Sequence, residues 1–260
     1  GALIAPSTAS FDFTTTASGR TLDLNEAIMF DATFSGSGDR TITDSTFTAA
    51  GDVLISGGLL DLPTGTTTLG GSFEATAGAF DANGGLLYFT SVDAGNTVEF
   101  GGSDADTVLF AGVGDWAFTD VNATSTDSFT VATGTVTLPS GTLTVTEDFI
   151  VQDTIAHNGG MLRMVGVSGS NVVTLSGNDL TDLIIVATGG DYTLTDDSAA
   201  LLGDLTLIDG AFTVGSGTVA VNADGVSVDY TPAADFNGTE VITYTVSDGV
   251  LSDTTGTLTI

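Results

Sequence analysis

Few side chains in this 260-residue sequence are suited to catalysis. His157 is the only histidine, there is neither cysteine nor lysine, and the other basic side chains are Arg20, Arg40 and Arg163. His157 directly precedes Asn158-Gly-Gly, a turn sequence, so we interpret it as an exposed turn residue. No Gly-x-Ser-x-Gly elbow, phosphate loop or histidine metal motif is present. The sequence therefore predicts that the protein is not an enzyme.

Carboxylates are abundant, and they are the groups that Ca²⁺ prefers. The chain has 33 Asp and Glu residues, and Ca²⁺ takes several hard oxygen ligands. The candidate calcium ligands form three loop clusters: Asp104 with Asp106, Asp196 with Asp197, and Asn222 with Asp224. Loop Asp and Asn also satisfy the backbone of turns, which gives each cluster a structural alternative. Because the EF-hand pattern is missing, we expect at most weak, charge-driven calcium binding, and no other cofactor.

The net charge limits the partners of the chain. At −30 it offers no basic patch to nucleic acid phosphates, and it repels anionic lipid headgroups. No apolar run approaches the roughly 18 residues of a membrane span. Apolar residues make up 42% of the chain, so the acidity is not that of a disordered tail. We expect a folded chain with a large core, no nucleic acid binding and no membrane insertion.

The sequence repeats itself with a spacing of 76 residues. The segment Gly38–Asp44 (GDRTITD) recurs as Gly114–Asp120 (GDWAFTD) and as Gly190–Asp196 (GDYTLTD). A second block, residues 51–62, recurs twice at the same spacing. The repeat runs from about residue 34 to residue 217, roughly 2.4 copies, and repetition on this scale indicates stacked supersecondary units.

Each copy has the composition of short strands separated by Gly, Asn, Asp and Ser. In residues 142–217 we expect nine strands, near 142–146, 149–152, 154–157, 161–165, 171–175, 182–186, 191–195, 203–208 and 211–214. Nine strands fit three coils of about 25 residues each, so the sequence predicts an all-β chain with a parallel β-helix of about three coils per repeat. A row of antiparallel sandwiches is the competing fold. We expect these residues to point inward: Ile42, Val53, Phe118, Phe129, Leu194 and Leu205.

One repeat position carries large side chains in all three copies. Trp116 and Tyr192 occupy it in two copies, and Arg40 occupies it in the first. Aromatic rings on a surface can stack on sugars, so Trp116 and Tyr192 are the candidate ligand-binding residues. The alternative is that these rings pack within the fold.

The pattern changes after Gly217. The segments Tyr230–Gly238 (YTPAADFNG) and Tyr244–Gly249 (YTVSDG) resemble the bacterial cadherin-like, immunoglobulin-type domains that occur in tandem in very large surface adhesins. The Gly/Thr-rich residues 34–217 resemble, more loosely, the β-helical repeats of large exported bacterial proteins. We therefore expect two parts: a β-helical domain at 1–217 and a partial cadherin-like β-sandwich segment at 218–260. The second part is expected to contain a hairpin that turns at Asp224-Gly225.

The expected function follows from these two parts. A sandwich of about 90 residues cannot close from the last 43, so its missing strands would come from the β-helix, from further chain or from another subunit. We expect an extracellular, cell-surface structural protein, either a filament subunit or a stalk in an adhesin. Its partners would be further copies of the chain or neighbouring domains. The alternative is an adhesin module that binds a glycan or a cell surface, and the third possibility is a polysaccharide-active β-helix enzyme.

Overall fold

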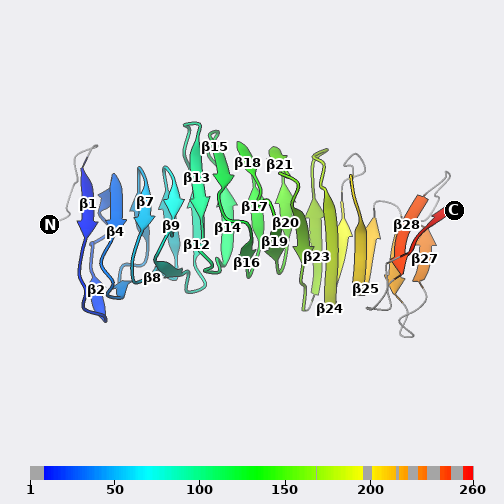
Figure 1. Ribbon diagram of the computed structural model, residues 1–260, viewed down its shortest axis with the longest axis horizontal. Helices are drawn as coiled ribbons and strands as arrows, with labels where there is room; N and C mark the ends of the chain where they lie inside the picture. The colour runs from blue at the N-terminus through cyan, green and yellow to red at the C-terminus, as the bar shows by residue number, and fades with distance from the viewer. Residues whose placement is uncertain are drawn as a thin grey trace.

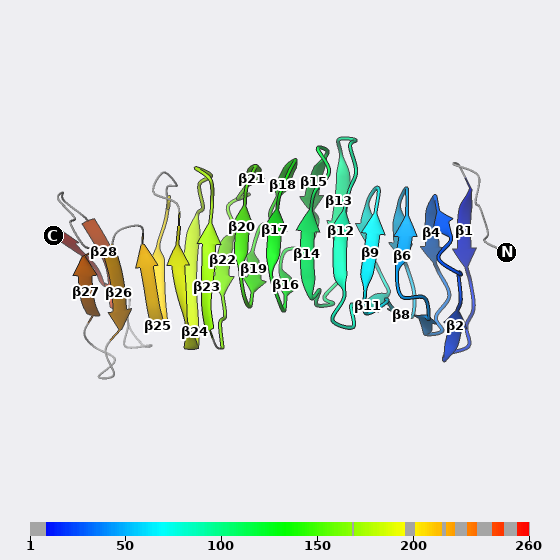
Figure 2. The same ribbon diagram turned by 180° about the vertical axis from the view of Figure 1, so that it is seen from behind.

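The computed structural model describes residues 9–167, 169–195, 201–214, 217–221, 228–232, 241–246 and 254–259. Within these ranges all regular structure is β-strand, and there is no helix that could cross a membrane. The strands up to β25 wind into a parallel solenoid of about ten coils, stacked along the long axis of the molecule (Figure 1). The same stacking is seen from behind in Figure 2. The parallel pairing confirms the β-helix and excludes antiparallel sandwiches for this part of the chain.

Each coil contributes strands to three faces in a fixed order along the chain. The first face consists of β1 (Ser10–Phe13), β4 (Asp31–Phe34), β7 (Val53–Ile55), β10 (Phe73–Glu74), β13 (Asn96–Glu99), β15 (Asp115–Phe118), β18 (Thr135–Thr137) and β21 (Thr154–Ala156). The second face begins with β2 (Arg20–Leu22), β5 (Arg40–Ile42), β8 (Leu59–Asp61) and β11 (Ala79–Asp81). Its place in later coils is taken by β16 (Ala123–Ser125), β19 (Thr142–Val145) and β22 (Met161–Met164).

The third face closes each coil. It consists of β3 (Ile28–Met29), β6 (Phe47–Ala49), β9 (Thr66–Leu69), β12 (Leu86–Phe89), β14 (Thr107–Phe110), β17 (Phe129–Val131), β20 (Phe149–Val151) and β23 (Gly169–Thr174). The long strands β24 (Asp182–Leu194) and β25 (Leu205–Val214) serve the second face with their first halves and the third face with their second halves. The nine strands expected in 142–214 are therefore found, with the last four joined in pairs.

The coil is shorter than expected. Paired residues in neighbouring coils are mostly 20 or 21 positions apart, as in Phe47 with Thr67 and Val108 with Phe129, and the extremes are 19 and 25. The expected length of about 25 residues is wrong for most coils, because the corners need fewer residues than the turn sequences suggested. A 76-residue repeat consequently spans more than three coils.

The sequence repeat moves from face to face along the solenoid. Arg40 lies in β5 on the second face, Trp116 in β15 on the first, and Tyr192 in the half of β24 that belongs to the third. Equivalent residues of successive repeats thus occupy equivalent positions on a face, but each repeat ends on a different face from the one on which it began. This is possible because all three faces present the same environment, with inward apolar and outward polar side chains.

The core is a continuous column of inward side chains. On the third face Phe89 and Phe110 are register partners whose nearly parallel rings lie 4.4 Å apart, and Phe129 and Phe149 repeat this stacking at 5.7 Å. All four rings are fully buried. Among the residues expected to point inward, Ile42, Val53, Phe118 and Phe129 are buried, and Leu194 and Leu205 pack partly buried against the same core.

The pairing changes from parallel to antiparallel at the end of the solenoid. β25 pairs in parallel with β24 and antiparallel with β26 (Gly217–Val221), which forms an antiparallel pair with β27 (Val228–Pro232). A separate antiparallel pair consists of β28 (Val241–Val246) and β29 (Thr254–Thr259). The expected strand pairing of the hairpin is present, and its turn at Asp224-Gly225 lies outside the described residues.

Candidate functional site

Strand edges lie at the N-terminal end of the described solenoid. Among the residues that the structure describes, β1, β2 and β3 are each the last strand in their ladder and pair on one side only. In the first face the carbonyl oxygens of Ala9 and Phe13 accept hydrogen bonds from the next coil, at Asp31 N and Ser35 N. Backbone groups alternate along a strand, so those of Ser10 and Asp12 point towards the open edge. A further strand could pair there.

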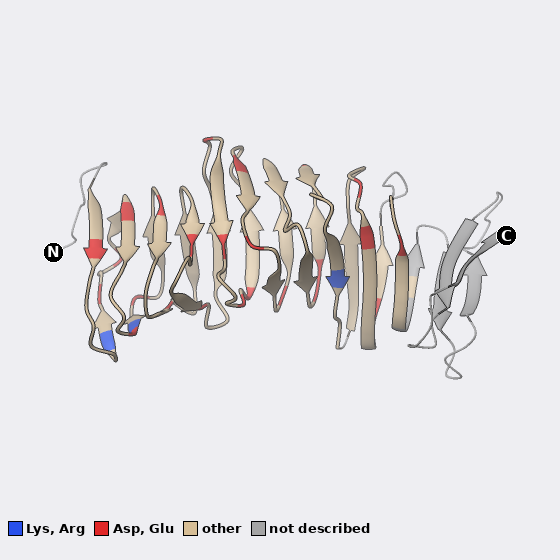
Figure 3. Ribbon diagram, viewed as in Figure 1, with Lys and Arg blue, Asp and Glu red and all other residues tan. Residues whose placement is uncertain are grey.

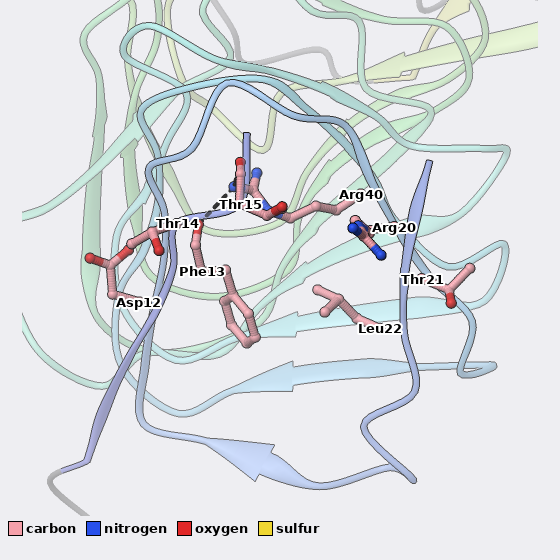
Figure 4. Close-up of a pocket in the computed structure, with 8 residues that line it drawn as sticks. All are labelled: Asp12, Phe13, Thr14, Thr15, Arg20, Thr21, Leu22 and Arg40. Atoms are coloured by element: carbon pink, nitrogen blue, oxygen red, sulfur yellow. Dashed lines mark hydrogen bonds between the residues drawn. The ribbon is translucent and has the colours of Figure 1, made fainter. Parts of the chain in front are cut away.

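A pocket lies at the same end of the solenoid, between the first two coils. Its volume is about 420 Å³, and its lining consists of Asp12, Phe13, Thr14, Thr15, Arg20, Thr21, Leu22 and Arg40 (Figure 4). Two of the three arginines of the chain line it, and they are register partners in β2 and β5. Arg20 is exposed, whereas Arg40 is 1% exposed, so the pocket has one accessible and one buried guanidinium group.

The Arg40 guanidinium is only partly satisfied by the protein. Its Nη2 donates to the carbonyl oxygens of Phe13 at 2.7 Å, Thr15 at 3.2 Å and Gly36 at 3.2 Å, and its Cζ lies 5.9 Å from the ring centre of Phe34. The Nε and Nη1 atoms are buried without a hydrogen-bond partner. The guanidinium is therefore surrounded by carbonyl dipoles and a ring face inside the fold.

Gly36 makes room for this arginine. A Cβ atom at position 36 would lie 1.9 Å from the carbonyl oxygen of Thr15 and 2.6 Å from Arg40 Nη2. Both distances are far below van der Waals contact, so only glycine lets the second coil pass this close to the first. The Gly36-to-Arg40 segment is therefore built around the arginine.

Trp116 and Tyr192 lie in the core. Trp116 is 1% exposed and packs against Phe89 and Phe110, with ring centres 6.3 and 5.3 Å away. Tyr192 is fully buried, and its hydroxyl donates to the carbonyl oxygen of Thr146 at 2.7 Å. Burial raises the pKa of Tyr192 far above its usual value, and the carboxylates of Asp148 and Glu147 contribute. Neither ring offers a face to a sugar, so the alternative of a packing role describes both.

The repeat position that carries these rings also explains the burial of Arg40. Trp116, Arg40 and Tyr192 are the three largest fully buried side chains in the described part of the chain. Each has a long apolar stem or ring and a polar tip, and each points inward from the residue that directly follows a Gly-Asp pair. The repeat aligns these three positions in the sequence, but the sequence analysis did not predict that the arginine is buried. The signal that could have predicted it is the repeat position that Arg40 shares with two aromatic residues.

The described calcium candidates do not assemble a site. Asp106 uses its carboxylate oxygens on Gly84 N, at 2.5 Å, and on the hydroxyl of Thr126, at 2.6 Å, while Asp104 is exposed. Over the residues that the structure describes, no three Asp, Glu or His side chains converge as metal ligands would. The other four candidates lie outside these residues: Asp196, Asp197, Asn222 and Asp224. Calcium binding stays a prediction.

Many aspartates bind the backbone of a neighbouring coil instead. Asp44 accepts hydrogen bonds from Leu24 N and Glu26 N, at 2.6 and 2.8 Å. Asp120, one repeat later, accepts from Phe100 N and Gly101 N in the same way, at 2.5 and 3.1 Å. Each carboxylate thus clamps a corner of the preceding coil. The short aspartate side chain suits this role, which accounts for the excess of Asp over Glu.

His157 also serves a turn. Its Nδ1 accepts a hydrogen bond from Gly159 N at 3.1 Å and lies 2.6 Å from the hydroxyl of Thr181 in the next coil. The position in a turn is as expected, although the ring is partly buried rather than exposed.

One carboxylate pair stands out electrostatically. Asp127 and Glu147 lie on neighbouring coils and share a hydrogen bond. That bond and the repulsion from Asp127 raise the pKa of Glu147, and Asp148 adds to the repulsion. The pKa of Asp127 is lowered, mainly because Thr107 donates a hydrogen bond to it at 2.6 Å. The opposite shifts of the two pKa values make this corner of the coil sensitive to pH.

Comparison with known proteins identifies one part of the chain. Residues 167–260 match the sequence model of the bacterial Ig domain family. No curated protein and no solved structure matches the chain. The fold and the match together define a β-solenoid followed by a bacterial Ig-type segment, as the resemblance of both parts implied.

The family match extends further than the C-terminal motifs indicated. It begins at residue 167, before β23, rather than near residue 218. Its 94 residues are close to the length of an Ig-type domain, so the sequence does not lack the first half of such a domain. In the structure β23, β24 and β25 nevertheless pair in parallel with the coils. The expected boundary between residues 217 and 218 stays a prediction.

Proposed function

We propose that this chain is a structural unit of a bacterial surface stalk or filament, extended by the addition of β-strands at its end. The bacterial Ig-type match and the solenoid favour a surface adhesin or structural protein without enzymatic activity. Ig-type modules of this kind are typical of surface and exported proteins, which supports an extracellular location. A solenoid holds its ends apart at a fixed distance, which is what a stalk requires.

The observation that carries this proposal is the open edge at the first coil. Every strand from β4 to β9 has a parallel neighbour on both sides, whereas β1, β2 and β3 have one. Unpaired edges bind further strands readily, because the new backbone hydrogen bonds need no particular side chains. A strand from another copy, or from a preceding module of a longer chain, would continue one face, and a full coil of three strands would continue all three.

Substitution of Ser10 by proline tests this mode of assembly. The backbone of Ser10 points to the open edge, so proline removes an edge donor without removing a bond to β4. We expect the natural chain to form end-to-end particles whose length grows with concentration, and S10P to remain at single-rod length. Light scattering and negative-stain microscopy measure both properties.

Ser10→Ala is the matched control, because it changes the side chain and keeps the backbone donor. It should assemble like the natural chain. If the natural chain stays monomeric at millimolar concentration, or if S10P and S10A assemble alike, the strand-addition proposal is wrong. Thermal unfolding of both variants shows that the solenoid is intact.

The alternative of a glycan-binding module has lost its two aromatic candidates, because Trp116 and Tyr192 are buried. The carboxylate pair Asp127 and Glu147 gives no support to a polysaccharide-active enzyme, since no described basic group lies with it. The structural role is therefore the function that the described geometry supports best.

A further inference from the structure

The N-terminal pocket concentrates positive charge in a strongly acidic protein. The chain carries a net charge of −30 with only three arginines, and two of them line this one pocket. Figure 3 shows the two arginines on neighbouring coils at the N-terminal end, while acidic residues are spread along the solenoid. Arg20 and Arg40 are register partners in β2 and β5, so both side chains start from the same position on neighbouring coils. Two stacked cations favour an anion between or beside them.

The buried arginine supplies a second, independent indication. Arg40 is 99% buried and lines the pocket, yet its Nε and Nη1 have no acceptor. Buried polar groups in folded proteins are nearly always hydrogen-bonded, and a charged donor without an acceptor is the most costly exception. The three carbonyl contacts all go to Nη2, so Nε and Nη1 are donors for which the fold supplies no acceptor, and the exposed Arg20 is the guanidinium that a ligand meets directly. A carboxylate is the anion whose geometry a guanidinium matches best among small organic groups.

The rest of the lining restricts the ligand further. Phe13 and Leu22 give the pocket apolar walls, and Thr15 and Thr21 give it hydroxyl groups. Asp12 is the one acidic residue in the lining, and it would repel a second negative charge but accept a hydrogen bond from a ligand hydroxyl. A volume of about 420 Å³ holds one ring-sized molecule.

We propose that this pocket binds a small hydroxylated monocarboxylate, of the size of a single sugar acid. The carboxylate lies toward Arg20 and Arg40, the hydroxyl groups face Asp12 and the threonines, and the carbon skeleton contacts Phe13 and Leu22. This binding is separate from the structural role proposed above, because it uses inward side chains of the first coils and not the backbone edge.

The three arginines make a direct test feasible. The Nε–H groups give only three side-chain signals in a proton–nitrogen correlation spectrum, and single substitutions assign each of them. Glucuronate is the probe, and glucose is its neutral match. We expect saturable shifts of the Arg20 and Arg40 signals with glucuronate, no such shifts with glucose, and no response of Arg163, which lies on β22 in a later coil.

Affinity measured on variants completes the test. Arg20→Gln should weaken glucuronate binding about tenfold, since it removes one charge-assisted hydrogen bond, whereas Arg163→Gln should leave it unchanged. Arg40 variants can fail to fold, so the evidence for Arg40 comes from its signal in the natural chain. The S10P variant is measured in parallel, because it separates a loss of assembly from a loss of glucuronate binding.

Several results would overturn the proposal. These are an Arg40 signal that does not move with glucuronate, equal shifts with glucose, or equal affinity in Arg20→Gln and Arg163→Gln. Loss of assembly in S10P with glucuronate binding retained would support both proposals. Glucuronate binding without any assembly of the natural chain would support the pocket and remove the filament.

Discussion

At the scale of single residues, aspartate carboxylates stabilise the corners of this solenoid. Asp44 and Asp120 each accept hydrogen bonds from two backbone N–H groups of the preceding coil. Asp31 and Asp52 each accept one from the following coil, donated by Asp52 N and Ser72 N respectively. These bonds resemble the N-caps of helices, where a short polar side chain replaces a missing backbone acceptor. Much of the negative charge is therefore structural in origin.

Replacing Asp120 by alanine tests the value of such a clamp. The N–H groups of Phe100 and Gly101 lose their acceptor, so we expect a loss of about 1–2 kcal/mol in the free energy of unfolding. Asp120→Asn keeps one acceptor oxygen and should lose about half as much. Thermal and urea unfolding give these values. Asp104→Ala, at an exposed aspartate, is the control and should change stability by less than about 0.5 kcal/mol. Equal losses at the two positions would contradict the clamp.

The pair of Asp127 and Glu147 predicts a pH dependence. The raised pKa of Glu147 means that the folded chain favours its protonated form, so ionised Glu147 destabilises the fold at neutral pH. Glu147→Gln should be more stable at pH 7 by less than about 1 kcal/mol, since the pair is open to solvent. The difference should narrow as the pH falls through the raised pKa and vanish below 4.5, the ordinary glutamate value.

The partner residue provides the control for this effect. The lowered pKa of Asp127 works in the opposite direction, since its stabilisation is present above the ordinary carboxyl pKa and is lost as the pH falls through the lowered value. In an Asp127→Asn background, Glu147→Gln should raise stability at pH 7 by less, because the interactions with Asp127 are gone and only the smaller effects of burial and of Asp148 remain. An unchanged benefit in that background would place its origin elsewhere. Thermal melts between pH 3 and pH 8 measure both.

At the scale of elements, glycine corners set how closely the coils stack. Gly36 and Gly112 occupy the same repeat position, and at each a Cβ atom would lie 1.9 Å from a carbonyl oxygen of the preceding coil. Because that neighbour is backbone, it cannot move without breaking the parallel ladder. The close approach, rather than an unusual backbone angle, is what requires glycine here.

Gly112→Ala should therefore disrupt packing in the middle of the solenoid. The new methyl group would collide with Ser91 O and, at 2.5 Å, with the carbonyl carbon of Thr90, so we expect a loss of about 3 kcal/mol or more. Gly95→Ala is the matched control: it has open space but a φ of +82°, so about 1 kcal/mol of backbone strain is its only cost. Denaturant unfolding compares the two. A loss at Gly112 no larger than that at Gly95 would contradict the contact.

At the scale of the whole molecule, the charge of −30 covers a largely apolar column. Most core side chains of the described solenoid are apolar, Arg40 is the buried cation among them, and the acidic groups lie at corners and outward positions. Such a charge keeps rods apart at low ionic strength and destabilises each of them by self-repulsion. At high ionic strength the screening length is only a few ångströms, so salt weakens both the repulsion between rods and the self-repulsion within each rod.

Ionic strength should accordingly change the melting temperature. We expect a rise of several degrees between about 10 mM and about 500 mM sodium chloride, since screening reduces repulsion among the carboxylates. Calcium chloride at equal ionic strength separates screening from binding. A larger rise with calcium would support the calcium prediction, and equal rises would leave screening as the sole cause. A melting temperature that falls with sodium chloride would contradict the repulsion.

Features that depend on local pattern could be predicted from the amino-acid sequence. Strand positions, the all-β class and the inward set of Ile42, Val53, Phe118 and Phe129 follow from alternation and from turn residues, which act over a few positions. The family resemblance of the C-terminal part was likewise visible in short motifs, although its beginning at residue 167 was not.

Only the tertiary structure decided the features that depend on how coils stack. The length of a coil is the sum of three corners, and each corner is set by contacts with the coils on either side, so a spacing of 76 residues could not reveal a coil of 20 or 21. For the same reason the repeat position of Arg40, Trp116 and Tyr192 was not known to point inward from three different faces. The pocket with its two arginines lies between two neighbouring coils, whose residues are about 20 positions apart in the sequence, so no local pattern records it.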